Sequence, residues 1–409
     1  MSVYDVFRER GFIQQMSHEE PLVNYLTREK ATVYVGFDAT APSLHVGHML
    51  PLMALAHMQR HGHRPIAVVG GGTTMIGDPS GKEEMRPILT PETIEENKRG
   101  IRQQIGRFID ISADDKGMMV DNADWLLPLN YIEFLREVGA HFSVNRMLTA
   151  ECFKTRLERG LSFIEFNYML LQSYDFLTLF RRYVCRLQMG GDDQWSNMLS
   201  GADLIRRIEG GEAYVLTFPL LATASGKKMG KTEAGAVWLA ADRTSPFDFY
   251  QYWRNVDDAD VARFLALFTF LAMGEVRRLG ALRDREVNEA KKVLAFEVTK
   301  IVHGQKAAEE ARAAAEALFG AGQDDSAIPT TMVARASLEA GIPVLDLLVL
   351  TGLAPSKSEG RRLITQGGLY FGEDQVHDAA QVVKTADLTD GRLLLRKGKK
   401  QFHQVKMGG

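Results

Sequence analysis

The fold is decided by residues 32–48, which read TVYVGFDATAPSLHVGH. The β-branched and aromatic residues at the start of this stretch predict a strand over Thr32–Phe37. A turn with Pro and Ser follows, and from about His45 to Arg60 the apolar residues recur at helical spacing, which predicts a helix. A strand that passes through a turn into a helix is typical of an α/β domain.

Similar strand signals return farther along the chain. Short apolar runs over Pro65–Val69, Met118–Val120 and Val184–Met189 have the composition of buried parallel strands. Strands that alternate with helices predict a parallel sheet with helices on both faces, which we interpret as a Rossmann-like α/β domain. Such sheets bind ligands beyond the carboxyl ends of their strands, and the triple glycine after Val69 falls at one of these ends.

The rest of the chain changes character twice. Helical patterns run from about Phe247 to Phe319, and a polar segment with Gly, Asp and Pro follows over Gly320–Thr331. The last part has the pattern of a small α+β module, with helices over Val344–Leu350 and Ser356–Gln366 and strands around Leu369–Phe371 and Leu393–Leu395. We therefore expect a catalytic domain, a loop with a helical domain, a linker and a small domain over residues 1–226, 227–322, 323–335 and 336–409.

The composition is that of an ordinary globular protein. The chain has 409 residues, of which 45% are hydrophobic and 25% charged, and its formal net charge is -3. This charge gives no general attraction to nucleic acid, so such binding would need local basic patches. Cys152 and Cys185 form no metal or disulfide pattern, which favours a reducing cytoplasm. The sequence also predicts no transit peptide over Met1–Met16 and no membrane span.

Two histidines stand at the start of the first predicted helix. His45 and His48 are three residues apart, so their rings share one face, where they can donate to phosphate oxygens or to a ribose. Gly47 between them would let a nucleotide approach the backbone. The pair alone is also compatible with surface histidines or a metal site, because four-residue motifs often arise by chance.

Three polar loops carry further candidate chemistry. Gly77–Lys82, with Arg86 after it, combines a carboxylate with two cations, and Gly190–Gln194 follows a buried strand. Lys228–Thr232 predicts a mobile cationic loop that could close on a triphosphate. Each loop by itself is also compatible with an ordinary solvated turn.

The segment Phe163–Phe180 is apolar around its whole circumference, which predicts a buried helix. Tyr168, Gln172 and Asp175 nevertheless fall on one stripe of this helix, at positions i, i+4 and i+7. Buried polar groups need partners, because each unpaired group costs about 1–3 kcal/mol. A polar stripe is usually a solvated face, but the apolar neighbours of this one favour a ligand that supplies some of the partners.

Taken in order, these motifs resemble the bacterial tyrosyl-tRNA synthetases, which are class I aminoacyl-tRNA synthetases. The resemblance is carried by the polar stripe and by residues 34–38, 44–48, 77–82, 190–194 and 228–232. It extends to residues 353–364, LAPSKSEGRRLI, which resemble the RNA-binding domain named after ribosomal protein S4. Val35, Ala39 and Met229 depart from the residues common in the family, but none of them removes an assigned charge or donor.

The resemblance implies a tyrosine site. Two residues would face the substrate phenol, namely Tyr34 and Asp175. Others would hold the ammonium group, namely Asp78, Tyr168 and Gln172. The tyrosine and the adenylate would be lined by Gln188, Gly191 and Gln194.

The resemblance also implies a nucleotide site. The residues close to the nucleotide or its ribose would be Gly36, Asp38, Gly47, His48, Gly191, Asp193 and Lys231. Asp193 rather than Asp192 is assigned to the ribose from its spacing to Gln194. The catalytic group, which would stabilise the triphosphate and the leaving pyrophosphate, would consist of Thr40, His45, His48, Lys82, Arg86, Lys228, Lys231 and Thr232.

The implied reaction has two steps. Tyrosine and ATP, which carries Mg²⁺, form tyrosyl-adenylate and pyrophosphate, and the 3'-terminal adenosine of tRNA then receives the tyrosyl group. No side chain forms a covalent intermediate, so orientation and charge stabilisation would supply the rate. The family works as a cytoplasmic homodimer whose tRNA spans both subunits, and the protein itself holds no metal.

A local basic patch suits the implied RNA partner. Lys357, Arg361 and Arg362 cluster on one helical face, and residues 392–406 contain six Lys and Arg and no acidic residue. Charge runs are usually solvated surface, but this local field suits a phosphate backbone.

Three other functions are compatible with parts of the pattern. A tryptophanyl enzyme shares the architecture, although Tyr34 with Asp175 suits a phenol better than an indole. A nucleotidylyltransferase with the histidine motif would need neither the helical middle nor the RNA module. An RNA-binding paralogue without catalysis would be free to lose the histidines and lysines that are present here.

Overall fold

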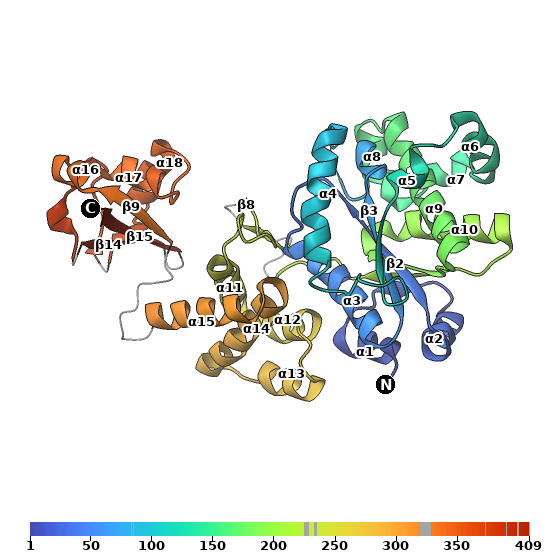
Figure 1. Cartoon of the computed structure of the whole chain (residues 1–409), viewed down its shortest axis with the longest axis horizontal. Coiled ribbons are helices and arrows are strands. Elements are labelled where there is room, and N and C mark those ends of the chain that lie inside the picture. Colours follow the sequence, from blue (N-terminus) through green and yellow to red (C-terminus); the bar gives the residue numbers. More distant parts are fainter. Residues whose placement is uncertain are drawn as a thin grey trace. The chain divides into compact units, whose positions relative to one another are not determined.

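The computed structural model describes residues 1–82, 84, 86–224, 229–232, 235–319, 329–372, 374–389, 391–398 and 401–408, with the backbone alone at positions 231, 232, 318 and 319. The chain forms two compact units, Met1–Ala308 (unit 1) and Glu309–Gly409 (unit 2), and Figure 1 labels many of their elements. Of the expected domain limits, positions 226–228 and 323–328 lie outside the described residues.

Unit 1 is built on a six-stranded sheet. Its strands are β1 (Gln15–Met16), β2 (Thr32–Asp38), β3 (Arg64–Gly70), β4 (Met118–Asp121), β5 (Leu187–Gly191) and β6 (Tyr214–Phe218). They lie in the order β1-β6-β5-β2-β3-β4, and all neighbours are parallel except the edge pair β1 and β6. The chain passes from β2 to β3 on one side and later returns to β5 on the other, so a topological switch point lies beside β2. The predicted α/β fold with a parallel sheet is confirmed.

The strand predictions agree with the structure over most of their length. The first three predicted runs lie within β2, β3 and β4. The strand predicted over Val184–Met189 begins only at Leu187, because Val184 adopts a positive φ of 53° and ends the preceding helix. β1 and β6 were not predicted, although all five residues of β6 are buried and have the β-branched and aromatic composition of a core strand.

Helices cover the sheet of unit 1 (Figure 1). Their bounds are α1 (Val3–Arg10), α2 (Glu19–Arg28), α3 (Met49–Arg60), α4 (Pro91–Ile105), α5 (Ala123–Leu126), α6 (Tyr131–Glu137), α7 (Val144–Leu148), α8 (Glu151–Arg159), α9 (Phe163–Tyr183) and α10 (Trp195–Glu209). The helix predicted from His45 starts with a 3-10 turn over Val46–His48, and Pro51 fits the first turn of α3, where its missing N–H has no intrahelical partner to lose. α9 begins at a capping box in which Ser162 and Glu165 satisfy each other's backbone N–H groups.

The middle of the chain is helical, as predicted. It contains α11 (Pro246–Arg254), α12 (Val261–Phe268), α13 (Met273–Gly280), α14 (Val287–His303) and α15 (Gln305–Phe319). Trp253 is fully buried and contacts the rings of Phe264 and Phe268 at its core. The buried Arg10 of α1 donates to the backbone oxygens of Ala266 and Thr269, at 2.8 and 2.9 Å, and so ties these helices to the first helix of the chain.

Unit 2 is a small α+β domain. Its five-stranded sheet has the order β12-β11-β14-β15-β9. These strands are β9 (Thr330–Ala334), β11 (Leu369–Phe371), β12 (Asp374–Gln375), β14 (Arg392–Lys397) and β15 (Gln401–Gly408). The helices are α16 (Arg335–Ala340), α17 (Val344–Leu350) and α18 (Lys357–Thr365), and the short strands β10 (Ile342–Pro343) and β13 (Val382–Val383) pair with each other.

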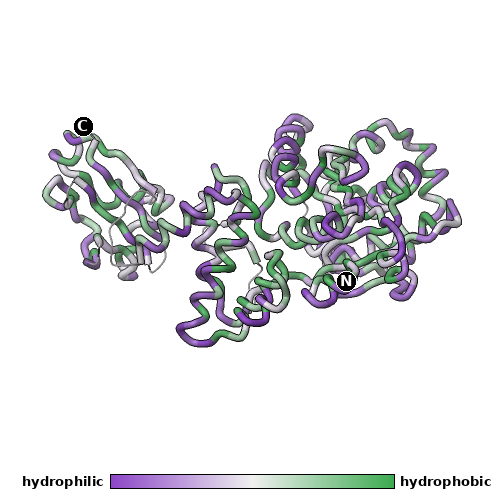
Figure 2. The backbone as a smooth tube through the Cα atoms, turned by 60° about the horizontal axis from the view of Figure 1, so that its bottom comes forward, coloured by the Kyte–Doolittle hydropathy of each residue, from purple (hydrophilic) through white to green (hydrophobic). Residues whose placement is uncertain are grey.

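Along the helices of both units, hydrophobic and hydrophilic positions alternate, as Figure 2 shows. This alternation is expected of helices that bury one face. None of the helices within the described ranges is both long and apolar enough to cross a membrane.

Candidate active site

The carboxyl ends of β2, β3 and β5 meet at the switch point, and α9 lies beside them. Asp38 ends β2, and its carboxylate accepts hydrogen bonds from the Tyr168 hydroxyl of α9 at 3.1 Å and from the Thr73 hydroxyl after β3 at 2.9 Å. The polar stripe of α9 therefore faces the ligand edge of the sheet rather than solvent. Tyr168 and Asp175, which lie on that stripe, are 6% and 4% exposed.

Asp175 is held by two donors from the segment after β4. Trp125 Nε1 donates to one carboxylate oxygen at 2.7 Å, and Asn122 Nδ2 donates to the other at 2.9 Å. Burial raises the pKa of Asp175 to about 7, although both donors favour its ionised form. The sequence patterns did not single out Asn122 and Trp125, although both follow a predicted strand at its carboxyl end.

Tyr34 lies near Asp175 from the side of β2. Its side chain is 2% exposed, and its hydroxyl has no hydrogen-bond partner among the described residues. Burial raises the pKa of Tyr34 well above its usual range, and the negative charge of Asp175 adds to the effect. A buried hydroxyl without a partner is costly, so this side chain is well placed to meet a ligand.

A second carboxylate, Asp78, is only 8% exposed. It accepts hydrogen bonds from Gln194 Nε2 at 2.8 Å and from the backbone N–H of Ser80 at 2.9 Å. Burial raises the pKa of Asp78 to about 6, and the charge of Asp38 contributes to this increase. Asn197 Nδ2 completes the network by donating to the Ser80 hydroxyl at 3.1 Å.

Together these groups define the kind of ligand that fits. Burial raises the pKa of Asp38, Asp78 and Asp175, and Asp38 adds repulsion to the other two. Buried amide oxygens without partners among the described residues also occur at Gln172 and Gln188. A site rich in acceptors and negative charge favours a ligand that donates hydrogen bonds and carries a positive charge.

The histidine motif adopts a defined tautomer. The backbone N–H of Gly47 donates to His45 Nδ1 at 3.0 Å, and the backbone N–H of His45 donates to His48 Nδ1 at 3.1 Å. Because each Nδ1 accepts, a neutral ring carries its proton on Nε2 and can donate from that atom. A Cβ at Gly47 would lie 2.7 Å from the His45 ring, so only glycine fits between the histidines.

The two distant motifs of the sequence lie side by side. Val46 N–H donates to Val237 O at 2.9 Å, and Val237 N–H donates to Gly230 O at 3.0 Å. Gly230 has a φ of 79°, and a Cβ there would lie 3.1 Å from Gly47 N. The backbone of the cationic loop thus packs on the histidine motif, while Lys228 lies outside the described residues and no side chain is described for Lys231 and Thr232.

The other predicted residues of unit 1 surround this arrangement. Arg86 Nε donates to Asp78 O at 3.2 Å. Burial raises the pKa of Asp38, and the charge of Arg86 offsets part of this increase. The partly exposed Lys82 lies in the same loop. Gly36 is exposed within β2, and a Cβ there would meet no atom within 4 Å, which leaves room for a ligand against the strand. Thr40 is exposed in the turn after β2.

The two neighbouring acids after β5 have different surroundings. Asp192 accepts hydrogen bonds from Gln15 and Thr217 at 2.6 and 2.7 Å, so the edge of the sheet already holds this carboxylate. Asp193 accepts from Gln194 at 3.3 Å, beside Gly81 of the second polar loop. The assignment of Asp193 rather than Asp192 to a ribose stays a prediction.

The basic residues predicted to bind RNA lie on α18 of unit 2. All three are exposed. Lys357 pairs with Asp346, and Arg362 approaches Glu359 at 3.4 Å. Arg361 is exposed on the same helix.

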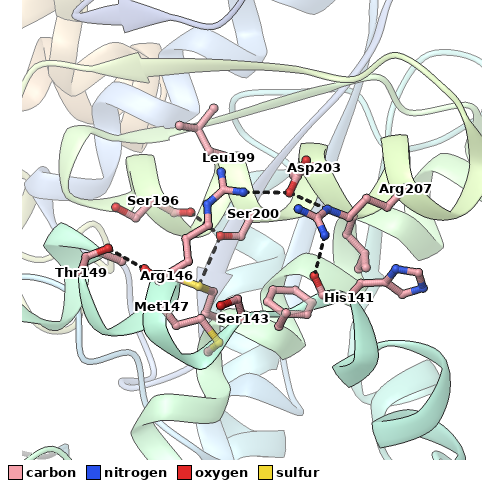
Figure 3. A pocket seen from close by; sticks show the side chains of 14 residues that line it. His141, Ser143, Arg146, Met147, Thr149, Ser196, Leu199, Ser200, Asp203 and Arg207 are labelled. Carbon is pink, nitrogen blue, oxygen red and sulfur yellow. Dashed lines mark hydrogen bonds and ion pairs between the residues drawn. The ribbon is translucent and has the colours of Figure 1, made fainter.

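A separate cavity of about 220 Å³ lies between α7 and α10 (Figure 3). Asp203 occupies its wall and accepts from Arg146 at 3.3 Å and from Arg207 at 2.8 Å. Of the predicted site residues whose side chains the structure describes, none lines this cavity. The candidate active site is therefore the cluster at the switch point and not this cavity.

Comparison with known sequences gives matches along nearly the whole chain. The family described as "tRNA synthetases class I (W and Y)" matches residues 26–320, and the "Tyrosine--tRNA ligase SYY-like C-terminal domain" matches residues 323–405. The chain is 59% identical over 404 residues to the tyrosine–tRNA ligase of Clostridium tetani, which covers 99% of this chain and 98% of that protein. It is 57% identical over 406 residues to that of Acetivibrio thermocellus, with 99% of each chain covered.

Solved structures show the same fold. A C-terminally truncated mitochondrial tyrosyl-tRNA synthetase of Aspergillus nidulans superposes with a TM-score of 0.71 at 29% identity, covering 78% of this chain and 94% of that chain. A tryptophanyl-tRNA synthetase of Encephalitozoon cuniculi superposes with a TM-score of 0.56 at 13% identity, and the match covers 75% of this chain and 87% of that chain. At this identity the likeness shows a shared fold alone.

The unpartnered hydroxyl of Tyr34 predicts an effect on stability. Tyr34→Phe removes a buried polar group without a partner. We therefore expect it to increase the free energy of unfolding of the ligand-free protein by about 1 kcal/mol and so to raise its unfolding temperature. Tyr25→Phe is the matched control, because the Tyr25 hydroxyl is buried but accepts from Thr32 N–H at 3.1 Å. This second variant should lower the unfolding temperature. Calorimetry that finds both variants equally destabilised would contradict the prediction.

Proposed function

The chain belongs to the class I tRNA synthetases of the tryptophan and tyrosine group, and we propose that its buried site between β2 and α9 holds the amino acid while the histidine motif holds ATP. The activity is that of a tyrosine–tRNA ligase, which joins tyrosine to its tRNA at the expense of ATP. Each part of this activity can be assigned to individual residues.

The unpartnered Tyr34 hydroxyl near the Asp175 carboxylate is the observation that carries the assignment of the tyrosine side chain. A phenol both donates and accepts a hydrogen bond, so it can donate to the Asp175 carboxylate and accept from the Tyr34 hydroxyl. An indole only donates and would leave the Tyr34 hydroxyl without a partner. The pair therefore favours tyrosine over tryptophan.

The ammonium group of the substrate fits the opposite end of the site. Asp78 supplies a carboxylate, Gln172 supplies an unpartnered amide oxygen, and Tyr168 supplies a hydroxyl. A positive charge among these acceptors offsets the repulsion between the buried carboxylates. With both ends held, the substrate carboxylate would point toward the nucleotide side, which would be lined by Gln188 within β5, Gly191 at its end and Gln194 after it.

In the first step a carboxylate oxygen of tyrosine forms a bond to the α-phosphorus of ATP, and the bond from that phosphorus to the bridging oxygen of pyrophosphate breaks. Negative charge then accumulates on the leaving pyrophosphate. His45 and His48 would stabilise it or the ribose from their Nε2–H groups, with Thr40 and the cations Lys82, Arg86, Lys228 and Lys231 around them. ATP would enter as its Mg²⁺ complex, with the phosphate oxygens as the main ligands.

In the second step the terminal ribose hydroxyl of tRNA attacks the carbonyl carbon of tyrosyl-adenylate, and AMP leaves. Unit 2 would bind the tRNA through Lys357, Arg361 and Arg362 on α18, which offer exposed cations to phosphates. In this proposal the catalytic domain ends at position 226 and the small domain that binds tRNA begins at position 336. The reaction would take place in a reducing cytoplasm, which suits the buried free thiols Cys152 and Cys185.

A homodimer is supported by an apolar surface on unit 1. The segment from α5 to the start of α9 exposes large hydrophobic side chains, namely Leu127, Tyr131, Ile132, Leu135, Val144, Leu148, Leu157 and Phe163. Exposed apolar residues in such number along one segment mark an interaction surface. Because an identical subunit offers the same surface, a two-fold contact would cover both copies.

Exchange of pyrophosphate with ATP tests the assignment of the amino acid. Without tRNA, we expect the purified protein to catalyse exchange with tyrosine and not with tryptophan or phenylalanine. Asp175→Ala should reduce this exchange by about 100-fold or more, because it removes the acceptor for the phenol, and the fold should stay intact. Asp203→Ala, in the separate cavity, is the control and should retain exchange. Normal exchange by Asp175→Ala would refute the phenol assignment.

The raised pKa of Asp175 predicts a pH dependence of tyrosine binding. The phenol donates to the ionised carboxylate, and the carboxyl takes up a proton below its pKa of about 7. The dissociation constant of tyrosine, measured by calorimetric titration, should therefore rise as the pH falls below 7, by about tenfold per pH unit. Trp125→Phe removes a donor to the carboxylate and should shift the midpoint to higher pH. An affinity that is constant between pH 6 and 8 would rule this out.

The dimer surface can be tested by mass. Light scattering should give the wild-type protein about twice the 45.6 kDa of one chain. Phe163, which is 71% exposed, lies in the apolar surface, so Phe163→Glu should shift the mass toward a monomer. Met332→Glu changes a side chain of unit 2 that is 62% exposed and should leave the mass unchanged. A wild-type mass of 45.6 kDa would refute the homodimer.

A further inference from the structure

The turn that joins β2 to the histidine motif is held from outside by helix α4. Residues 39–45 contain no regular strand or helix, so their backbone groups depend on partners elsewhere. Two of the proposed triphosphate residues, Thr40 and His45, lie at the two ends of this turn. The side chains of α4 that reach it belong to Asn97 and Gln104, with Gly100 between them.

Asn97 holds the start of the turn. Its side chain is 3% exposed, and its amide nitrogen donates to the backbone oxygen of Ala39 at 2.8 Å. The backbone N–H of the same Ala39 donates to the Thr74 hydroxyl at 2.8 Å. Both polar backbone groups of Ala39 are therefore fixed by side chains, and Thr40 is the next residue.

Gln104 holds the end of the turn in the same way. Its side chain is 6% exposed, its amide oxygen accepts from Leu44 N–H at 2.8 Å, and its amide nitrogen donates to the Ser43 hydroxyl at 3.0 Å. That hydroxyl also accepts from Ala240 N–H at 3.2 Å, in the segment that follows the cationic loop. Gln104 thus connects α4 to the turn before the histidine motif and, through Ser43, to the segment that follows the cationic loop. His45 is the residue after Leu44.

Gly100 allows the turn to lie against the helix. A Cβ at this position would come within 2.1 Å of Pro42 O. Positions 97, 100 and 104 share one face of α4, so the helix presents two amides on either side of a gap that fits the turn. α4 is itself fixed, because Ile101 and Ile105 are buried in the core and Lys98 forms an ion pair with Asp121 at the end of β4.

We infer that α4 is a template for the triphosphate site: Asn97 and Gln104 are positioning residues that act through Thr40 and His45 on the activation of tyrosine. This inference rests on the proposed roles of Thr40 and His45. Burying two amides is favourable only if they are bonded, and both place their bonds on this one turn, on its backbone and on the Ser43 hydroxyl. Displacement of a catalytic group by about 1 Å can cost about 100-fold in rate, so small losses of fixation should be visible in the chemical step.

The test compares Gln104→Leu with a matched variant one position away. Leucine has a similar size but makes neither hydrogen bond, whereas Gln103 is exposed and Gln103→Leu should change nothing. We expect Gln104→Leu to slow single-turnover formation of tyrosyl-adenylate by about 10- to 100-fold. The dissociation constant of tyrosine should stay within about twofold of the wild-type value, because the tyrosine site does not involve this turn. Asn97→Leu should show the same division.

A double-mutant cycle separates positioning from general damage. If Gln104 acts through His45, then Gln104→Leu should have little further effect in a His45→Ala background. Additive effects of the two substitutions, an unchanged rate in Gln104→Leu, or an equal loss of rate and tyrosine affinity would each overturn the inference. Should Gln104→Leu fold poorly, Gln104→Glu keeps the acceptor for Leu44 N–H, and an intermediate loss of rate would support the same role. A wild-type protein that forms no tyrosyl-adenylate would instead overturn the proposed function.

Discussion

One electrostatic constraint governs unit 1: the carboxylates of Asp38, Asp78 and Asp175 share a site that is mostly closed to water. Burial and mutual repulsion both favour the protonated forms, so this cluster costs stability at neutral pH. Donors from separate elements reduce the cost, including Trp125 for Asp175 and the backbone of Ser80 for Asp78. An excess of negative charge and acceptors remains, which a substrate ammonium group and phenol can satisfy. Binding of tyrosine therefore relieves part of the destabilisation that the buried carboxylates cause in the ligand-free protein, and this relief contributes to the binding free energy.

The two halves of the site rest on different kinds of structure. The tyrosine side is built mainly from β2, β5 and the 21-residue helix α9, and the hydrogen bonds of Asp78 fix the loop that completes it, so its groups are held before the substrate arrives. The nucleotide side is built from turns, and the contact between Gly47 and Gly230 brings two motifs about 180 residues apart into one backbone junction. Glycine is required at both positions because a Cβ at either one would crowd the other motif or the His45 ring. Recognition thus depends on a rigid scaffold, while catalysis depends on the close fit of loops against it.

Local patterns explain what the sequence could predict. The strands β2, β3 and β4 and the buried stripe of α9 follow from periodicity and composition within a few residues, and the structure agrees with them. Asn122 and Trp125 were missed because their partner, Asp175, is about 50 residues away and meets them only through the order of the strands. The start of β5 was predicted at Val184 rather than at Leu187 because a positive φ at a β-branched residue has no local signal. The basic run near the carboxyl end belongs largely to β14 and β15; the strand predicted around Leu393–Leu395 lies within β14, whereas β15 was not predicted.

The unpartnered atoms of the site also explain how selectivity for tyrosine arises without further machinery. Phenylalanine has the shape of tyrosine, but it would bury the Tyr34 hydroxyl and the Asp175 carboxylate against a C–H edge. Each buried polar group left without a partner costs about 1–3 kcal/mol, so discrimination comes from the hydrogen bonds that the wrong substrate fails to make. In the ligand-free protein the Tyr34 hydroxyl has no partner among the described residues, and Asp175 is a buried carboxylate that only two side-chain donors from these residues stabilise, so both groups lower its stability. Selectivity and reduced stability therefore have one physical origin. A substitution that makes the ligand-free protein more stable by removing one of these polar groups should also weaken its selectivity for tyrosine.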